Sequence, residues 1–351
     1  MSTKFITTAA ALAAVGIVGF AGAASARDQI RIVGSSTVYP FTTAVAEEFG
    51  KAGGGKTPVV ESTGTGGGFK LFCGGVGVGH PDISNASRPI RKSEFEDCQK
   101  NGVKDIVEIK VGIDGLSIAQ SKAGAALKLT LAQTYLALAE KVPDKDGKLI
   151  PNPYKNWSDI DPSLPNIKIE VLGPPPTSGT RDAFHELFLE PGALKIPALA
   201  ALRKSDRKAF DNAWKSIRQD GVYVEAGEND NVIVQKLEAN RNAFGIFGYS
   251  FLEENTAKLR GVPIEGVEPE YDAIAAGKYA GARPLFIYVK KQHAGVIPGI
   301  DKYVAEYVSQ KAMSKDGYLA RKGLISLPPA EATKIAADAQ ALKPMTAADV
   351  K

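Results

Sequence analysis

The stretch "DIVEIKVGIDGLSIAQ" at residues 105–120 has the character of one extended segment, and it is unusually long for a strand. A second extended, apolar stretch, "ARPLFIYVKK", occupies residues 282–291. Two such segments can cross between two lobes of a protein. Two crossings mean that the second lobe is inserted into the first, and a protein of that kind binds its ligand in a cleft and closes by hinge rotation.

Strand-like and helix-like segments alternate on both sides of residues 105–120, which is typical of a parallel α/β sheet. The predicted strands and helices have these ranges: strands 30–36, 57–63, 81–87, 167–173, 221–224 and 244–248, and helices 38–49, 63–73, 93–102, 179–190, 203–219 and 301–314. We therefore predict an α/β fold with two lobes and a ligand between them. Lobe I comprises residues 27–117 and 284–351, and lobe II comprises residues 118–283.

Local signals suggest how three of these helices begin. Ser36 or Thr37 is expected to cap the helix at 38–49, and Thr65 is expected to cap the helix at 63–73. A capping box from Ser93 to Glu96 predicts the start of the helix at 93–102.

The first 26 residues differ from the rest of the chain. Lys4 is their only charge, an Ala-rich apolar run follows, and Ala24-Ser25-Ala26 precedes the polar residues that start the next segment. This pattern predicts a secretory signal peptide at residues 1–26, cleaved after Ala26. The alternative is an N-terminal membrane anchor. With cleavage, the mature chain is expected to be an exported, soluble, periplasmic protein.

Composition excludes several classes of function. Without Lys4 the chain has 42 basic and 39 acidic residues, a net charge too small to indicate nucleic-acid binding. Export predicts that Cys73 and Cys98 form a disulfide, and the alternative is a pair of buried thiols. Spacings such as C-x-x-C are absent from the sequence, so we expect no metal site and no cofactor.

The string "GKAGGGKT" at residues 50–57 matches the nucleotide-binding pattern G-x-x-x-x-G-K-[ST]. That motif needs a strand before the loop and a helix after it, because amides at a helix start hold the phosphates. Here a predicted helix precedes the loop, and Pro58 and a strand follow it. The loop therefore leaves the negative end of a helix, and we predict that it binds no nucleotide.

Three other segments have the order that anion binding needs: a strand end, small polar residues and a helix start. They are "GSST" at 34–37, "TGTGGG" at 63–68 and "PTSGTR" at 176–181. Hydroxyls and free amides at a helix start can bind an anion. Each segment alone is better explained by ordinary helix capping. Together, two in lobe I and one in lobe II, they can converge on one anion from both sides of a cleft.

Charged residues near these segments extend the candidate site. Arg88 and Arg181 can each form paired hydrogen bonds to an oxyanion, although either can also be a surface ion pair. Asp114 stands in an otherwise apolar stretch, where it is either a turn residue or an acceptor for a protonated oxyanion. Sulfate has no proton at neutral pH, so a buried acceptor disfavours it.

The segments "GSSTVYPF", "STGTGGGFKLF", "DISNASRPI", "DGLSIA" and "SGTRDAF" occur in this order after the leader. In this the chain resembles the periplasmic phosphate-binding proteins of phosphate ABC importers. The resemblance implies a two-lobed binding protein that captures inorganic phosphate and delivers it to a membrane permease. It also implies a set of ligand residues: Ser36, Thr37, the amide of Val38, Thr65, Ser178, Gly179 and Thr180.

This chain departs from the family pattern at two positions. Many members carry Asp where this chain has Arg88, and many carry Arg shortly before Ser-Gly-Thr, where this chain has Gly173 and three prolines. We therefore expect Arg88 and Arg181 to supply the positive charge and Asp114 to accept a proton from the ligand. The alternatives are a binding protein for sulfate, molybdate or arsenate, and a secreted hydrolase. A hydrolase is disfavoured because no G-x-S-x-G motif is present. We expect a monomer without enzymatic activity.

Overall fold

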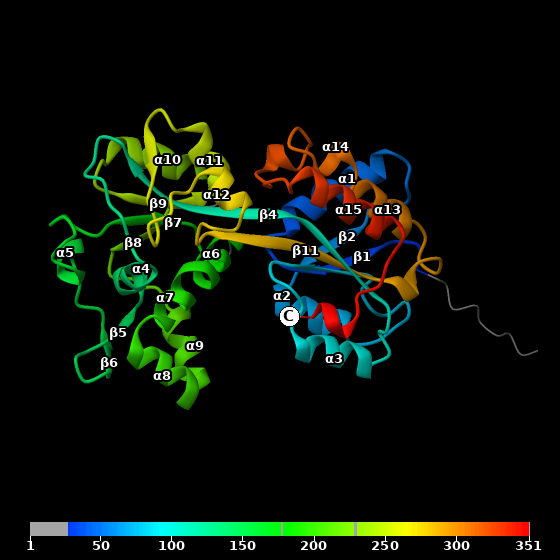
Figure 1. The fold of residues 1–351 in the computed structure, drawn as a ribbon, viewed down its shortest axis with the longest axis horizontal. Helices are drawn as coiled ribbons and strands as arrows, with labels where there is room; N and C mark the ends of the chain where they lie inside the picture. The colour runs from blue at the N-terminus through cyan, green and yellow to red at the C-terminus, as the bar shows by residue number, and fades with distance from the viewer. Residues whose placement is uncertain (1–26, 177, 228–229, 351) are drawn as a thin grey trace, which may run out of the picture.

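The computed structural model describes residues 27–176, 178–227 and 230–350, so the predicted signal peptide lies outside the described residues. Within this part of the chain, nine strands form one sheet in the order β2-β1-β3-β11-β4-β9-β7-β8, with β10 also paired to β4. Figure 1 shows two lobes, each with helices packed around its part of the sheet. The predicted α/β fold with two lobes is therefore confirmed.

The elements of lobe I and of the two connecting strands are β1 (Arg31–Gly34), α1 (Tyr39–Lys51), β2 (Val59–Ser62), α2 (Thr65–Phe72), β3 (Ile83–Ala86), α3 (Lys92–Lys100), β4 (Ile106–Ser121), β11 (Ala282–Lys290), α13 (Ile300–Tyr307), α14 (Gln310–Met313) and α15 (Pro329–Gln340). The elements of lobe II are α4 (Leu131–Leu138), β5 (Lys141–Pro143), β6 (Leu149–Pro151), α5 (Trp157–Ile160), β7 (Val171–Gly173), α6 (Gly179–Phe184), α7 (Glu190–Leu194), α8 (Pro197–Ser205), α9 (Arg207–Lys215), β8 (Tyr223–Glu225), α10 (Asp230–Ala239), β9 (Phe244–Gly248), α11 (Tyr249–Glu254), β10 (Leu259–Gly261) and α12 (Tyr271–Ala275).

The two long strands β4 and β11 pass between the lobes, as their sequences predict (Figure 1). They are antiparallel neighbours from residue 106 to residue 115 of β4, and from there β4 pairs with β9 of lobe II instead. One strand thus belongs to the sheets of both lobes. The lobe boundaries at residues 117/118 and 283/284 stay a prediction.

The sheet is mixed: each lobe has the parallel strands that the alternation predicts, and the two connecting strands are antiparallel. β1 runs parallel to β2 and β3, and β7 runs parallel to β8 and β9. β4 and β11 are antiparallel to each other and to the neighbours they join. Strand β4 leads from lobe I to lobe II and β11 leads back, so the two strands run in opposite directions. The alternation of strands and helices in the sequence does not indicate this antiparallel pair.

The predicted helix starts need three corrections. Helix α1 has Val38 at its N-cap with no side-chain cap bond, so neither Ser36 nor Thr37 caps it. Helix α2 has Gly64 at the N-cap, and Thr65 is its first helical residue. The capping box of α3 involves Arg91 and Glu94, two residues earlier than the predicted Ser93 and Glu96.

Two longer helix predictions also change. The predicted helix at 203–219 is two helices, α8 and α9, and the predicted helix at 301–314 is α13 and α14. The helical segment at 179–190 is continuous, but it contains a π-helical turn at His185–Leu189 between α6 and α7.

A separate apolar cluster in lobe I packs α2 and α3 against the sheet, and it contains Phe69, Phe72 and Phe95. The predicted disulfide between Cys73 and Cys98 lies in this cluster and joins the end of α2 to α3. By the chain-entropy model a closed loop of this size contributes about 3 kcal/mol.

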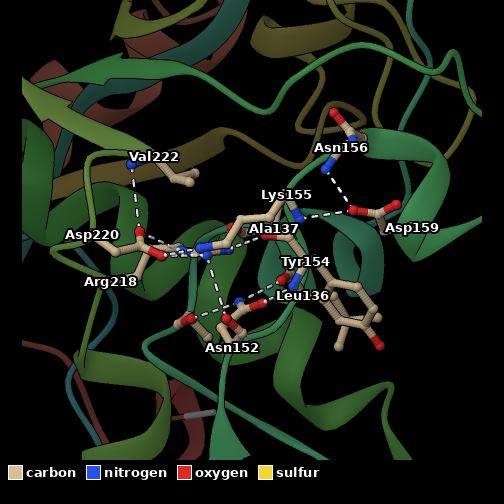
Figure 2. A network of polar contacts seen from close by, with 11 residues as sticks. Leu136, Ala137, Asn152, Tyr154, Lys155, Asn156, Asp159, Arg218, Asp220 and Val222 are labelled. Atoms are coloured by element: carbon tan, nitrogen blue, oxygen red, sulfur yellow. Dashed lines mark hydrogen bonds and ion pairs between the residues drawn. The ribbon is translucent and has the colours of Figure 1, made fainter.

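Lobe II has a polar network of its own around the buried Arg218 (Figure 2). Its guanidinium donates to both oxygens of Asp220 at 2.9 and 2.5 Å and to the carbonyl of Tyr154 at 2.8 Å. Asn152, which follows β6, donates to the carbonyls of Leu136 and Ala139 at 2.7 and 2.8 Å. These bonds tie the β5–β6 hairpin to the rest of the lobe, and they give the network a structural role.

Candidate functional site

The start of α1 faces lobe II. Gly34 ends β1 with φ 130°, and a Cβ there would lie 2.2 Å from the carbonyl oxygen of Asn85, so only glycine fits. The Oγ of Ser36 donates to Oδ2 of Asp182 in α6 at 2.9 Å. The Oγ1 of Thr37 donates to the carbonyl of Gly179 at 3.3 Å. The two hydroxyls predicted as ligands therefore lie between the lobes.

The start of α2 lies in the same lobe. Gly64 has φ 71°, which lets the chain turn into the helix, and Thr65 is 8% exposed. The hydroxyl of Thr65 lies 3.0 Å from the hydroxyl of Ser87, whose amide donates to Thr65 Oγ1 at 3.2 Å. Ser87 follows β3, and the sequence reasoning passed over it in favour of its neighbour Arg88.

The third helix start belongs to lobe II. The Oγ of Ser178 accepts a hydrogen bond from the amide of Thr180 at 3.2 Å, so Ser178 is the N-cap of α6. Gly179 touches lobe I, since a Cβ at this position would lie 2.8–3.0 Å from backbone atoms of Ser36 and Thr37. The backbones of the two lobes are in contact here, and they can approach this closely because Gly179 has no side chain.

Arg283 lies at the centre of the contact between the lobes, and the sequence prediction missed it. Its side chain is 5% exposed and lies opposite Asp114 in the register of β11 and β4. Nη2 donates to Thr37 Oγ1 at 2.6 Å, Nη1 donates to Glu186 Oε2 at 2.6 Å, and Nε donates to Asp114 Oδ2 at 3.2 Å. One guanidinium thus binds lobe I, lobe II and the adjacent connecting strand.

Asp114 is 18% exposed, pairs with Arg283 and lines the first cavity, and its role as an acceptor stays a prediction. Burial raises the pKa of this carboxyl group, and the neighbouring Arg283 acts in the opposite direction. A signal for Arg283 was present in the sequence, because it interrupts an apolar stretch just as Asp114 does. Only the register of the two strands reveals that they are partners.

Two cavities open beside this contact. One, of about 640 Å³, is lined by Ser36, Thr37, Asp114 and Ser178–Thr180 among others. The other, of about 650 Å³, is lined by Gly64–Gly66 of lobe I and by residues of lobe II that include Arg181, Asp182 and His185. Eight of the ten predicted ligand residues line these cavities. Six of them line the first, and Thr65 and Arg181 line the second, whereas Val38 and Arg88 line neither. Ser36 and Thr37 form the hydrogen bonds to Asp182 and Gly179 of lobe II.

The two arginines proposed from the sequence lie in different surroundings. Arg181 lines the second cavity and is held by groups of lobe II. Arg88 forms two hydrogen bonds to the carboxylate of Glu94 in α3, at 2.8 and 2.7 Å, and lies over the ring of Phe69. Its guanidinium is thereby bound within lobe I. Neither Arg88 nor Arg283 is among the described residues that line the two cavities.

The loop at residues 50–57 has the order of elements that the sequence predicts. Helix α1 ends at Lys51 and strand β2 begins at Val59. Lys51 pairs with Glu48 and Lys56 pairs with Asp28, and both lysines are more than half exposed. The glycines and lysines of this loop therefore lie at a helix end, away from the three helix starts.

Comparisons with known proteins agree with the two-lobed α/β fold. The family model of the PBP superfamily domain matches residues 21–311. Protein SphX of Synechococcus elongatus is 34% identical over 278 residues, which cover 78% of this chain and 71% of that protein. The phosphate-binding protein PstS of Staphylococcus saprophyticus is 29% identical over 338 residues, covering 95% and 91% of the two chains.

A solved structure shares the fold. The crystal structure of a possible phosphate binding protein from Planctomyces limnophilus superposes with a TM-score of 0.68 at 30% identity. The match covers 89% of this chain and 98% of that protein. In the described part of this chain, no helix has both the length and the apolar character to cross a membrane.

Proposed function

The chain belongs to the PBP superfamily, and on that premise we propose that it captures inorganic phosphate in the cleft between its lobes. The observation that carries the proposal is the buried Arg283, which binds Thr37 and Asp114 where the starts of α1 and α6 meet. Hydroxyls, helix-start amides and one guanidinium form an anion site, because all of them donate hydrogen bonds. The relatives named as phosphate-binding proteins support phosphate as the ligand.

In this proposal the anion is held without a metal or cofactor. Ser36, Thr37 and the amide of Val38 donate from lobe I, together with Thr65, and the segment Ser178–Thr180 donates from lobe II. Arg283 supplies the nearest positive charge, and Arg181 adds a second. Arg88 has no part in it as the chain is folded here, since Glu94 engages its guanidinium through two hydrogen bonds.

Asp114 gives the site its selectivity. Phosphate at neutral pH carries a proton that an acceptor can bind, and sulfate does not. A buried acceptor that meets an oxyanion without a proton stays unpaired, and sites of this type reject such analogues by up to ~10⁴-fold. Burial already raises the pKa of Asp114, which makes the carboxylate a strong acceptor.

Closure of the two lobes around phosphate presents the loaded protein to the permease of an ABC importer. The lobes are linked by β4 and β11, and Ser36, Thr37 and Gly179 are where they touch. We propose that the mature chain acts outside the cytoplasm, as a monomer that docks on its permease.

The proposed role involves no catalysis. Ser178 Oγ caps α6, and His185 is bonded to Arg181 and to the carbonyl of Trp214, so these two residues do not form a nucleophile–base pair. Phosphate release from p-nitrophenyl phosphate tests this point. Turnover that disappears in Ser178→Ala would make the chain a hydrolase.

Calorimetric titration of refolded, ligand-free protein with phosphate, arsenate, sulfate and molybdate tests the proposal. We expect phosphate to bind tightly and sulfate to produce no heat at the same concentrations. A ligand at 100 times its Kd should also stabilise the fold by about 2.7 kcal/mol, which a melting experiment detects. Binding of sulfate or molybdate without phosphate would assign the protein to another oxyanion.

A further inference from the structure

We propose that His185 is a positioning residue that fixes the guanidinium of Arg181 toward the bound anion, an inference that rests on the proposed function. His185 begins the π-helical turn that follows α6, four residues after Arg181. Its ring forms a hydrogen bond with the arginine itself. In this proposal His185 orients Arg181 and does not itself contact phosphate.

The hydrogen bonds of the pair have one possible direction. The Nε of Arg181 can only donate, and it lies 3.0 Å from Nε2 of His185. Nε2 must therefore be the acceptor, and the ring proton belongs on Nδ1, which lies 3.3 Å from the carbonyl oxygen of Trp214. Hydrogen bonds thus link the guanidinium of Arg181 through the imidazole of His185 to the backbone of α9.

The imidazole is suited to stay neutral in this place. Burial lowers the pKa of His185 to about 4, and the positive charges of Arg181 and Lys215 contribute to the shift. A protonated ring would lose the acceptor that Arg181 needs. The pair therefore keeps its geometry throughout the physiological pH range.

Two further contacts fix the guanidinium of Arg181. Nη1 of Arg181 donates to the carbonyl of Pro174 at 3.0 Å, and the guanidinium carbon lies 4.4 Å from the ring centroid of Tyr223. The hydroxyl of Tyr223 donates to the same carbonyl at 2.8 Å. Bonds on two nitrogens and a ring under one face leave a planar group little freedom to rotate.

The fixed guanidinium borders the anion cleft. Arg181 is 9% exposed and lines the second cavity together with Thr65 and Gly66, across from it in lobe I. An arginine held in one orientation loses less conformational freedom when an anion binds, so its positive charge contributes more to affinity. In this arrangement His185 acts on phosphate only through Arg181.

Three single variants and one double variant test the proposal by calorimetric titration with inorganic phosphate. His185→Phe keeps an aromatic ring and removes the acceptor, and we expect about tenfold weaker binding. His185→Gln is the matched control, because its amide oxygen can replace Nε2, and we expect its Kd to lie within about threefold of the unmodified protein. Arg181→Met should weaken binding by more than His185→Phe. The double variant His185→Phe/Arg181→Met should bind phosphate as Arg181→Met does, because the histidine has nothing left to position.

A merely structural histidine would give additive losses in the double variant, and equal losses for His185→Phe and His185→Gln; either result overturns the proposal. Long-range proton–nitrogen NMR spectra of the unmodified protein should show the proton on Nδ1, independently of any variant's folding. A proton on Nε2 would contradict the assignment. If the unmodified protein does not bind phosphate, the proposed function itself fails. If it binds and Arg181→Met binds equally well, only the role of His185 fails.

Discussion

Arg88 and Arg283 are both paired with carboxylates, and the difference between them separates a contact within one lobe from a contact that joins the lobes. Arg88 directs two hydrogen bonds to one carboxylate, that of Glu94, six residues away in the same lobe. Arg283 divides its hydrogen bonds among Thr37, Asp114 and Glu186, which lie 97 to 246 residues away in sequence. The contact of Arg88 with Glu94 stays within one lobe, at the start of α3, whereas the contacts of Arg283 join the two lobes.

Divided contacts also leave an arginine able to exchange partners. A bidentate pair gives up two charge-assisted bonds at once when either group turns away. Arg283 can release the neutral hydroxyl of Thr37 and keep its carboxylates, so an anion can enter at moderate cost. We therefore infer that Arg283, and not Arg88, is the cation that responds to phosphate.

Replacing Arg283 should have the largest effect. In Arg283→Met we expect phosphate affinity to fall by about 100-fold, or about 2.8 kcal/mol, because the nearest positive charge and its hydrogen bonds are lost. Calorimetric titration measures the change. Arg283→Lys keeps the positive charge but lacks the planar guanidinium, so its phosphate affinity should lie between that of the unmodified protein and that of Arg283→Met.

The variant Arg283→Met also leaves Asp114 without its guanidinium. The double variant Arg283→Met/Asp114→Asn removes that unpaired carboxylate and separates lost folding from lost binding. If the double variant is as stable as the unmodified protein and still binds phosphate normally, Arg283 has no part in the site.

Gly179→Ala should have the second largest effect. The added methyl group would meet the backbone of Ser36 and Thr37 at 2.8–3.0 Å, so the lobes could not approach as closely. We expect at least tenfold weaker phosphate binding with an unchanged melting temperature in the absence of ligand. Small-angle scattering with saturating phosphate should show a wider molecule than the unmodified protein. Full affinity in this variant would mean that Arg283 acts without close contact between the lobes.

Asp114→Asn should change selectivity more than affinity. An amide can donate to an oxyanion, so the penalty for sulfate should fall while the bond to Arg283 weakens. We expect the ratio of sulfate Kd to phosphate Kd to decrease by about tenfold. Competition titrations with both anions measure the ratio. An unchanged ratio would move the proton acceptor to another residue and leave Asp114 as a structural partner of Arg283.

The three segments proposed as ligands could be singled out in the sequence because each is a local pattern. A strand end, a small hydroxyl residue and a helix start are consecutive in the chain, and so Ser36, Thr65 and Ser178 were identifiable without a structure. Arg283 was not identifiable in this way, because its contact with Asp114, 169 residues earlier in the chain, depends on the register of β11 and β4. The position of Arg88 after β3 favours a place in the cleft, whereas in the structure its guanidinium is bound to Glu94, a contact that the sequence does not reveal.

Replacing Arg88 should therefore affect stability and leave binding intact. Arg88→Met removes two hydrogen bonds to a half-buried carboxylate, and we expect a loss of about 1–2 kcal/mol in the free energy of unfolding. Urea denaturation measures this loss, and the phosphate Kd should stay within about twofold. A tenfold loss of affinity in a folded variant would return Arg88 to the site and remove the distinction between the two arginines.

The smallest effect is expected at the loop that most resembles a phosphate-binding motif. Lys51 is the last residue of α1 and Lys56 follows that helix, at the end where exposed carbonyls repel an anion. Each lysine is already paired with a carboxylate at the surface. In Lys51→Ala/Lys56→Ala we expect an unchanged phosphate Kd at physiological salt, because exposed charges are screened over about 8 Å. Titrations at low and at physiological salt separate long-range attraction from contact. A loss that persists at both salt concentrations would mean that these lysines contact the anion directly, and it would move the site away from Arg283 and the starts of α1 and α6.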